Sequence, residues 1–296
     1  MAETLTTGSS GNTHPRSVTI IGAGTLGRRI AGTLAGYGQL VHLCDVSAEV
    51  LAAGVADARA IAARLLAVSG NSDGSVTPFD VMQEAVAEAW LVIEAVPERL
   101  ELKQRLFSEL DELVRPDTIL ASNSSSFRSS QMINEVSRPT RVLNTHFYQP
   151  PDLNGVELMS CGYTDPAIIA QLSTYFSAHG LRPFLVQQES TGFIYNRVWA
   201  AIKREALMVV AEGVGTPDDV DTLFCAAHGA SMGPFRLMDR VGLDVVLDIE
   251  EHYASERDGL PESPRTLLRE YIAAGRLGVK SGEGFYRYNA DGVRDA

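Results

Sequence analysis

The chain has 296 residues, 45% hydrophobic and 21% charged, a composition typical of a globular protein long enough for two domains. Its formal net charge of −12 argues against nucleic acid or an anionic membrane surface as the main partner, because both require clustered Lys and Arg. No apolar run approaches the ~20 residues that a membrane span needs. Residues 1–15 are polar and lack the apolar core of an export signal. We therefore predict a disordered N-terminal tail, no membrane association and a cytoplasmic location.

The cysteines also indicate a cytoplasmic location. They are widely separated and show neither a CxxC pair nor Cys/His spacing suited to a metal, so we predict reduced thiols and no metal site. The three are Cys44, Cys161 and Cys225.

The first predicted strand, residues 17–21, leads directly into "GAGTLG" and an apparent helix. This is GxGxxG in the strand-to-helix context that dinucleotide binding requires. The first glycine permits a tight turn, the second lets a pyrophosphate approach the backbone, and the third lets helix pack on strand. Free N–H groups at the helix N-terminus would hold the phosphates. The predicted cofactor contacts of this loop are Gly22, Gly24, Thr25, Leu26 and Gly27.

A second predicted strand, "LVHLCD", ends in Asp45. A carboxylate at this position can accept hydrogen bonds from both ribose hydroxyls and would repel a 2′-phosphate, so NAD is favoured over NADP. The competing interpretation is that Asp45 caps the helix predicted over residues 48–68.

Further strands and helices alternate through the first half of the chain. A turn-rich break at 69–80 is followed by a strand at 90–96, a helix at 100–114 and a strand at 118–125. This alternation predicts an α/β fold with a doubly wound, parallel, Rossmann-type sheet. Ligands of such sheets bind beyond the carboxyl ends of the strands. Those ends carry Gly22, Asp45, Pro97, Ser124 and His146.

The stretch "RVLNTHFYQPPDLNGVELM" places His146 at the end of an apolar strand, before two prolines and Glu157. Taken alone, a histidine here could be a buried core residue beside a rigid turn. Its place at the ligand-binding edge of the sheet favours a functional role instead.

From about residue 190 the apolar spacing becomes helical. We predict helices over 193–214, 216–229, 243–256 and 264–275, with one late strand at 284–288. Thr216 followed by proline and acidic residues is a strong helix start. The predicted organisation is a Rossmann-type domain over 16–189 and an all-helical C-terminal domain over 190–296.

Seven segments, in order from residue 17 to 288, together resemble the short-chain L-3-hydroxyacyl-CoA dehydrogenase family, which includes 3-hydroxybutyryl-CoA dehydrogenases. The resemblance implies an NAD-dependent enzyme that interconverts 3-hydroxyacyl and 3-oxoacyl thioesters and forms a homodimer through the helical domain. The segments are "IIGAGTLGRRIA", "LVIEAVPERLELKQRLFSELD", "ILASNSSS", "THFYQPP", "GFIYNRVWAAIKREALMVVAEGV", "MGPFRLMDRVGLDVVLDI" and "LGVKSGEGFYRY".

The resemblance also implies roles for individual residues. His146 matches the family's catalytic histidine and Glu157 its partner carboxylate, an arrangement suited to moving the hydroxyl proton. Ser125 and Asn196 match residues that contact the reacting oxygen, and Ser125 also contacts the cofactor. The remaining matches to NAD-contacting positions are Glu98, Lys103 and Lys280.

Two departures from the family pattern concern the substrate. The spacing from His146 to Glu157 is one residue shorter than usual, and Gln149 replaces the usual asparagine. Residues 46–102 contain no lysine, although the family uses lysines there to help hold CoA. The basic residues of that region are Arg59, Arg64 and Arg99.

Several alternatives therefore stay open. The acyl group could be carried on CoA or on a carrier protein, or the substrate could be a free hydroxy acid, as for sugar-acid and carnitine dehydrogenases of the same superfamily. A non-enzymatic, crystallin-like role would predict loss of the catalytic residues, which are all present. A β-hydroxyacid dehydrogenase or imine reductase would use a residue such as Lys203 in the long helix, but fits "HFYQPP" poorly.

Overall fold

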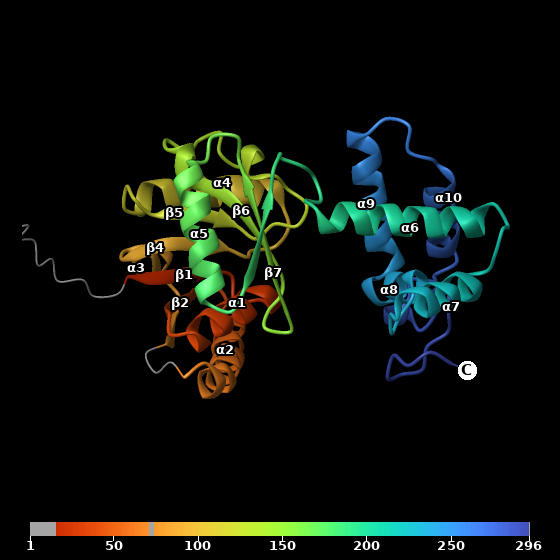
Figure 1. The fold of residues 1–296 in the computed structure, drawn as a ribbon, viewed down its shortest axis with the longest axis horizontal. Coiled ribbons are helices and arrows are strands. Elements are labelled where there is room, and N and C mark those ends of the chain that lie inside the picture. The colour runs from red at the N-terminus through yellow and green to blue at the C-terminus, as the bar shows by residue number, and fades with distance from the viewer. Residues whose placement is uncertain (1–15, 71–73, 296) are drawn as a thin grey trace, which may run out of the picture. The chain divides into compact units, whose positions relative to one another are not determined.

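The computed structural model describes residues 16–70 and 74–295, so the predicted tail at 1–15 lies outside the described part of the chain (Figure 1). The chain divides between Phe193 and Ile194 into two compact units. The boundary predicted from the sequence lies at 189/190.

The described residues of the first unit form one sheet of eight strands in the order β3-β2-β1-β4-β5-β6-β7-β8. Neighbouring strands are parallel except for β6 and β7, which form an antiparallel pair. The predicted Rossmann-type, doubly wound sheet is therefore confirmed. The strands are β1 (Ser17–Ile21), β2 (Leu40–Cys44), β3 (Ser75–Phe79), β4 (Ala89–Glu94), β5 (Ile119–Ser122), β6 (Val142–Gln149), β7 (Leu153–Ser160) and β8 (Arg182–Val186).

Helices cover both faces of this sheet, as Figure 1 shows. Side chains of α1, α2 and α5, such as Ile30, pack on one face, and those of α3 and α4, such as Phe107, pack on the other. Burial on both faces explains why the central strands read as apolar runs. The helices are α1 (Thr25–Gly36), α2 (Ala48–Ser69), α3 (Met82–Val86), α4 (Leu100–Leu113) and α5 (Pro166–Ala178), with short 3-10 turns at Ser129–Gln131 and Pro139–Arg141.

Two strands that the sequence pattern missed lie at the edges of the sheet. β3 falls inside the stretch interpreted as a turn-rich break and contains Pro78, while β8 contains Pro183. A proline lacks the N–H needed by a central strand, but an edge strand tolerates it. The two prolines therefore lie on the two edge strands, where their missing N–H is tolerated.

The second unit is helical, as predicted, and adds α8, which the pattern missed. Thr216 caps α7: its hydroxyl accepts the Asp219 N–H at 3.2 Å, and the Asp219 carboxylate accepts the Thr216 N–H at 2.9 Å. The helices are α6 (Tyr195–Ala211), α7 (Pro217–His228), α8 (Pro234–Val241), α9 (Leu243–Glu256) and α10 (Ser263–Ala273), followed by a 3-10 turn η3 (Val279–Ser281).

The strand predicted over 284–288 is wrong, because this segment forms only isolated bridges. Its backbone is held by a buried carboxylate instead. Asp239 accepts the N–H groups of Phe285 at 2.9 Å and Tyr286 at 3.0 Å, and the hydroxyl of Tyr288 at 2.9 Å. Backbone donors satisfied in this way need no strand partner.

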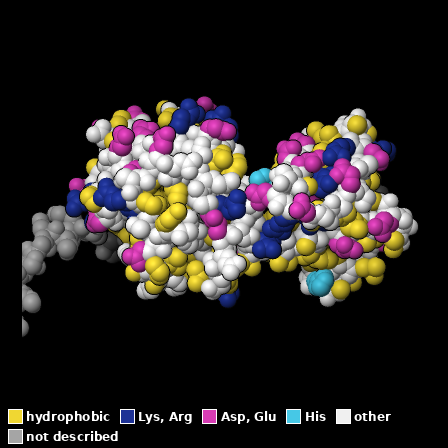
Figure 2. Space-filling view, turned by 90° about the horizontal axis from the view of Figure 1, so that it is seen from above, with side chains coloured by type: hydrophobic (Ala, Val, Ile, Leu, Met, Phe, Trp, Pro, Cys, Tyr) yellow, Lys and Arg dark blue, Asp and Glu magenta, His cyan; other side chains and the backbone are white. Residues whose placement is uncertain are grey.

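The surface carries charges of both signs. On the face drawn in Figure 2, acidic side chains alternate with Lys and Arg and no broad basic area forms. Across residues 16–70 and 74–295, no helix combines the length and hydropathy of a membrane span.

Candidate active site

The glycine-rich loop between β1 and α1 leaves room where the sequence predicts a pyrophosphate. Gly22 has a φ of +102°, and a side chain there would meet the carbonyl oxygen of Ala95 at 2.6 Å. A Cβ on Gly27 would lie 1.8 Å from the Gly22 oxygen, whereas nothing lies within 4 Å of a Cβ position on Gly24. Gly24 immediately precedes α1, whose first N–H groups favour an anion. Thr25 and Leu26 form the first turn of that helix.

Asp45 follows β2 and is fixed toward this loop. Its Oδ2 accepts the N–H of Ala23 at 2.8 Å and its Oδ1 accepts the N–H of Ser47 at 2.9 Å. The N-cap of α2 is Ser47, whose hydroxyl accepts the N–H of Val50. A carboxylate at the end of β2 suits the ribose hydroxyls of NAD, and the open space beside the second glycine suits its pyrophosphate.

A cavity of ≈ 400 Å³ lies at the carboxyl end of the central strands. Leu26 of α1, Glu98 after β4, Ser125 after β5 and His146 of β6 all contribute to its wall, together with Lys103 of α4. The fold thus collects five predicted site residues from five separate elements around one space.

His146 and Glu157 lie directly opposite each other on the antiparallel strands β6 and β7. His146 Nδ1 is 2.9 Å from Glu157 Oε2, and both side chains are buried. The imidazole contacts two rings, with Tyr148 edge-on at 5.4 Å and Phe193 at 5.0 Å between centroids. Because Nδ1 faces the carboxylate, Nε2 is the ring nitrogen available to a molecule in the cavity.

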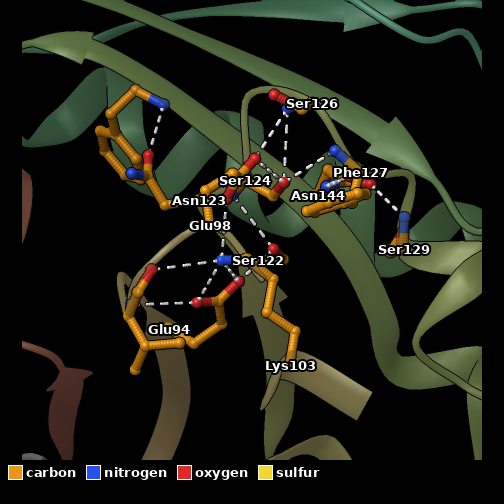
Figure 3. A network of polar contacts seen from close by, with 12 residues as sticks. Glu94, Glu98, Lys103, Ser122, Asn123, Ser124, Ser126, Phe127, Ser129 and Asn144 are labelled. Atoms are coloured by element: carbon orange, nitrogen blue, oxygen red, sulfur yellow. Dashed lines mark hydrogen bonds and ion pairs between the residues drawn. The ribbon is translucent and has the colours of Figure 1, made fainter. Parts of the chain in front are cut away.

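The serine segment after β5 is anchored by Glu98, as Figure 3 shows. The Ser124 hydroxyl donates to Glu98 Oε1 at 2.5 Å, and the Ser126 N–H donates to the same oxygen at 2.9 Å. The Phe127 N–H closes the turn by donating to the Ser124 hydroxyl at 2.8 Å. Ser125 lies between these anchored residues and is exposed at the cavity.

Lys103 links Glu98 to a second, fully buried carboxylate (Figure 3). Its Nζ lies 2.8 and 2.9 Å from the two oxygens of Glu94 and 3.2 Å from Glu98. It also donates to the Val96 carbonyl at 3.4 Å, and the Ser122 hydroxyl donates to Glu94. The ammonium group is therefore surrounded by acceptors from the protein itself, with only 1% of the side chain exposed.

The pKa values of the two carboxyls in this cluster, Glu94 and Glu98, are shifted in opposite directions. Burial raises the pKa of Glu94, although Lys103 opposes the shift. For Glu98 burial also acts upward, but Lys103 and the hydrogen bonds from Ser124 and Ser126 outweigh it and lower the pKa. Glu98 is consequently ionised at neutral pH, where it borders the cavity.

Three residues singled out in the sequence belong to the second unit. Asn196 lies in the first turn of α6 and is partly exposed. Lys280 lies in η3, with Nζ 2.5 Å from both oxygens of Asp244. Lys203 of α6 is buried, and this burial lowers its pKa to about 8 while Glu250 acts in the opposite direction.

Comparisons with known proteins identify the family. The family model "3-hydroxyacyl-CoA dehydrogenase, NAD binding domain" matches residues 17–190, and the model of the C-terminal domain matches residues 192–288. The chain belongs to the 3-hydroxyacyl-CoA dehydrogenase family. It is an NAD-dependent oxidoreductase, so the family resemblance and the predicted cofactor are confirmed.

Relatives of this dehydrogenase carry different names. A 5-formyl-3-hydroxy-2-methylpyridine 4-carboxylate 5-dehydrogenase of Mesorhizobium japonicum is 32% identical over 291 residues, 93% of this chain and 92% of that protein. A probable 3-hydroxybutyryl-CoA dehydrogenase of Bacillus subtilis is 33% identical, covering 92% and 97%. The crystal structure of an (S)-3-hydroxybutyryl-CoA dehydrogenase from Ralstonia eutropha is similar with a TM-score of 0.83 at 30% identity, covering 93% and 99%.

Sequence reasoning missed two polar residues of the dehydrogenase's site. Asn123 borders the cavity, and its Oδ1 accepts the N–H of Phe147 at 2.9 Å, which ties the end of β5 to β6 beside His146. Glu94 is the other, and its signal was present in the sequence. A carboxylate within the apolar run "LVIEAV" must be paired if it is buried, and Lys103 follows nine residues later.

Proposed function

We propose that the dehydrogenase interconverts a 3-hydroxyacyl thioester and the corresponding 3-oxoacyl thioester, with His146 as general base in one direction and general acid in the other, and Glu157 as its orienting carboxylate. The observation that carries the proposal is the 2.9 Å contact between His146 Nδ1 and Glu157 Oε2 at the wall of the cavity. The cavity begins at Leu26, directly beside the glycine loop that fits the cofactor.

Bound NAD supplies the hydride acceptor for alcohol oxidation. In that direction His146 Nε2 accepts the hydroxyl proton, and in the reverse direction the imidazolium returns it to the carbonyl oxygen. Glu157 holds the proton on Nδ1, which fixes the tautomer, and stabilises the charged ring when Nε2 is protonated. Because Glu157 is fully buried, water screens this stabilisation very little.

Ser125 and Asn196 are proposed to hold the reacting oxygen by hydrogen bonds. The position of Ser125 supports its role, because the segment that carries it is fixed on both sides by Glu98. The role of Asn196 is supported by its match to the family pattern.

Glu98, Lys103 and Lys280 are proposed to contact the cofactor, together with the glycine loop and Asp45. Glu98 is ionised and borders the cavity, so it can accept a hydrogen bond from a ribose hydroxyl. Lys103 already contacts two carboxylates and a carbonyl, and we propose that it acts mainly by holding Glu98 in place.

The carrier of the acyl group is proposed to be CoA or a carrier protein, and the alternative substrate is a free hydroxy acid. The contacts of two arginines support the free hydroxy acid. The guanidinium of Arg59 on α2 donates to the Val76 carbonyl at 2.8 and 3.1 Å, and Arg28 pairs with Asp57 at 2.8 Å. Both groups therefore already bind acceptors of the protein, which weakens them as ligands of the CoA phosphates. Relatives named for a CoA thioester and for a pyridine carboxylate have nearly equal identity to this chain.

An NADH-coupled assay separates these substrates. Acetoacetyl-CoA, an acetoacetyl carrier protein and free acetoacetate are compared at equal concentrations, followed by longer acyl chains. The proposal predicts a kcat/KM at least about 100-fold higher for one of the thioesters than for the free acid. Faster turnover of free acids would replace the proposal with its alternative.

We further propose that the dehydrogenase is a homodimer through its C-terminal domain. The second unit exposes apolar side chains that favour such a contact, among them Val198 at 55% and Leu223 at 70% of their surface. Sedimentation of the wild type and of Val198→Asp and Leu223→Asp variants tests this, with a dimer that dissociates in at least one variant as the expected result. A monomeric wild type would contradict the proposal.

A cytoplasmic location is proposed from the thiols. All three cysteines are free, and Cys44 and Cys161 are buried. Burial, aided by Asp45, raises the pKa of Cys44 to about 11, so this thiol stays protonated and unreactive. The protein thus relies on no disulfide, as expected in a reducing compartment.

A further inference from the structure

One arginine on the cofactor-binding helix reaches across to the turn beside the catalytic histidine. Arg29 lies on α1, one turn after Leu26, which lines the cavity. Its Nε donates to the Pro150 carbonyl at 2.9 Å, its Nη2 donates to the Gln149 carbonyl at 3.3 Å, and the same Nη2 pairs with the carboxylate of Asp152. Pro150 and Asp152 belong to the short connection between β6 and β7, and Gln149 is the last residue of β6.

This connection is the shortened segment noted in the sequence. The last rung of the β6–β7 ladder pairs Gln149 with Leu153, so residues 150–152 alone make the turn. Two of these three are prolines, which supply no N–H to bind the turn to its surroundings. The turn is therefore held through its acceptors, to which the guanidinium of Arg29 donates.

The turn continues directly into the wall of the active site. Tyr148, one residue before Gln149, lines the cavity and packs edge-on against the His146 ring. The Tyr148 ring also covers Gly155 of β7 so closely that a Cβ there would lie 2.4 Å from the ring. Any shift of the turn therefore moves Tyr148, since both strands that flank the turn contact its ring.

We infer that Arg29 is a positioning residue that fixes the 149–152 turn against α1 and thereby sets the place of Tyr148 and the width of the substrate cavity. A planar guanidinium suits this task, because it binds two carbonyls and a carboxylate at fixed angles that an ammonium cannot match. Arg29 also joins the helix at the predicted pyrophosphate site to the strand that carries His146. The inference rests on the proposed function only in the nature of the substrate.

The neighbouring Arg28 offers a matched control. It lies on the same helix and makes an ion pair of the same kind, with Asp57 at 2.8 Å, but it has no contact with the turn. Both arginine side chains are partly exposed, 32% for Arg28 and 25% for Arg29. A loss of surface charge or of helix stability would affect the two variants alike.

The test compares Arg29→Met, Arg29→Lys and Arg28→Met with the wild type. We expect Arg29→Met to lower kcat/KM for the acyl substrate about tenfold or more, mainly through KM, with the Kd for NAD within about twofold. Arg29→Lys should recover only part of this loss, and Arg28→Met should match the wild type. The inference is overturned if Arg29→Met and Arg28→Met have the same kinetic constants.

A second readout needs no substrate. Hydrogen exchange of the backbone amides at 152–156, measured without substrate, should be faster in Arg29→Met than in the wild type and unchanged in Arg28→Met. Equal exchange in all three proteins would show that Arg29 does not hold the turn. If exchange responds as expected but no 3-oxoacyl compound is turned over, the proposed function fails while the positioning role stands.

Discussion

Replacing Lys103 with Met tests the buried ion cluster behind the cavity. Methionine keeps most of the apolar stem but removes the charge that lies within 2.8 and 2.9 Å of the Glu94 oxygens and 3.2 Å from Glu98. Glu94 is fully buried, so the variant leaves an uncompensated buried carboxylate, which costs about 3–5 kcal/mol. At about 2–4 °C per kcal/mol for a unit of this size, the Tm should fall by roughly 6–20 °C.

The cost should depend on pH in a defined direction. Burial already raises the pKa of Glu94, and without Lys103 the pKa rises further. A carboxyl whose pKa is higher in the folded than in the unfolded state binds more protons when folded, so stability falls as the pH rises above the pKa of the unfolded state. Glu98 also makes the variant less stable at high pH. Its lowered pKa stabilises the folded wild type at pH values above the pKa of the unfolded state, and the variant loses that contribution. The deficit is therefore largest near pH 7.5 and shrinks toward pH 5.

Thermal and urea unfolding of the wild type and variant at about pH 5 and pH 7.5 measures this difference. The control is Arg115→Met, because the ion pairs of Arg115 within the described part of the chain are long and exposed, at 3.8 Å to Glu88 and 3.7 Å to Asp117. It should change stability by less than about 1 kcal/mol. The reasoning is refuted if Lys103→Met is as stable as the wild type at pH 7.5, or if its deficit is the same at both pH values.

Two further predictions concern the cofactor loop. Asp45→Asn keeps an oxygen for the Ala23 N–H but removes the negative charge that would repel a 2′-phosphate. The ratio of kcat/KM for NADP to kcat/KM for NAD should therefore rise about tenfold, equivalent to ~1.4 kcal/mol. An unchanged ratio in steady-state assays would show that Asp45 does not select the cofactor. Gly24→Ala should fold with a normal Tm but bind NAD poorly, because its Cβ enters open space meant for phosphate. Gly27→Ala should instead lose about 1–3 kcal/mol of stability or more, since its Cβ would lie 1.8 Å from the Gly22 oxygen; equal melting temperatures for the two variants would contradict this account.

The sequence was most informative where short-range chemistry determines the structure. The glycine spacing at 22–27, the acid after β2 and the Thr216 cap each depend on residues within one turn or one strand end, and the structure has the corresponding loop, carboxylate and helix start. Long-range pairing was harder to foresee. The two prolines predict a stiff loop between His146 and Glu157, yet strand β7 (Leu153–Ser160) begins four residues before Glu157. The Tyr148 ring leaves no room for a side chain at Gly155, and this contact forms only when β6 and β7 pair in the folded sheet.

The candidate site shows the same limit. His146 and its partner could be proposed from the sequence, but their face-to-face register across β6 and β7 could not. Arg29 gave no signal at all, because an arginine on a helix is usually a solvated surface residue. Its role depends on the turn that it reaches, which lies 121 residues away in the chain.

His146→Gln tests the central claim most directly. The variant and the wild type are compared for NADH-coupled turnover of the best thioester and for the Kd of NAD by titration. The account predicts a fall in kcat of about 10²–10⁴-fold with the Kd for NAD within about twofold, because glutamine removes the base at the cavity wall and leaves the glycine loop intact. Turnover near the wild-type rate, with NAD bound normally, would contradict the assignment of His146 as the general base.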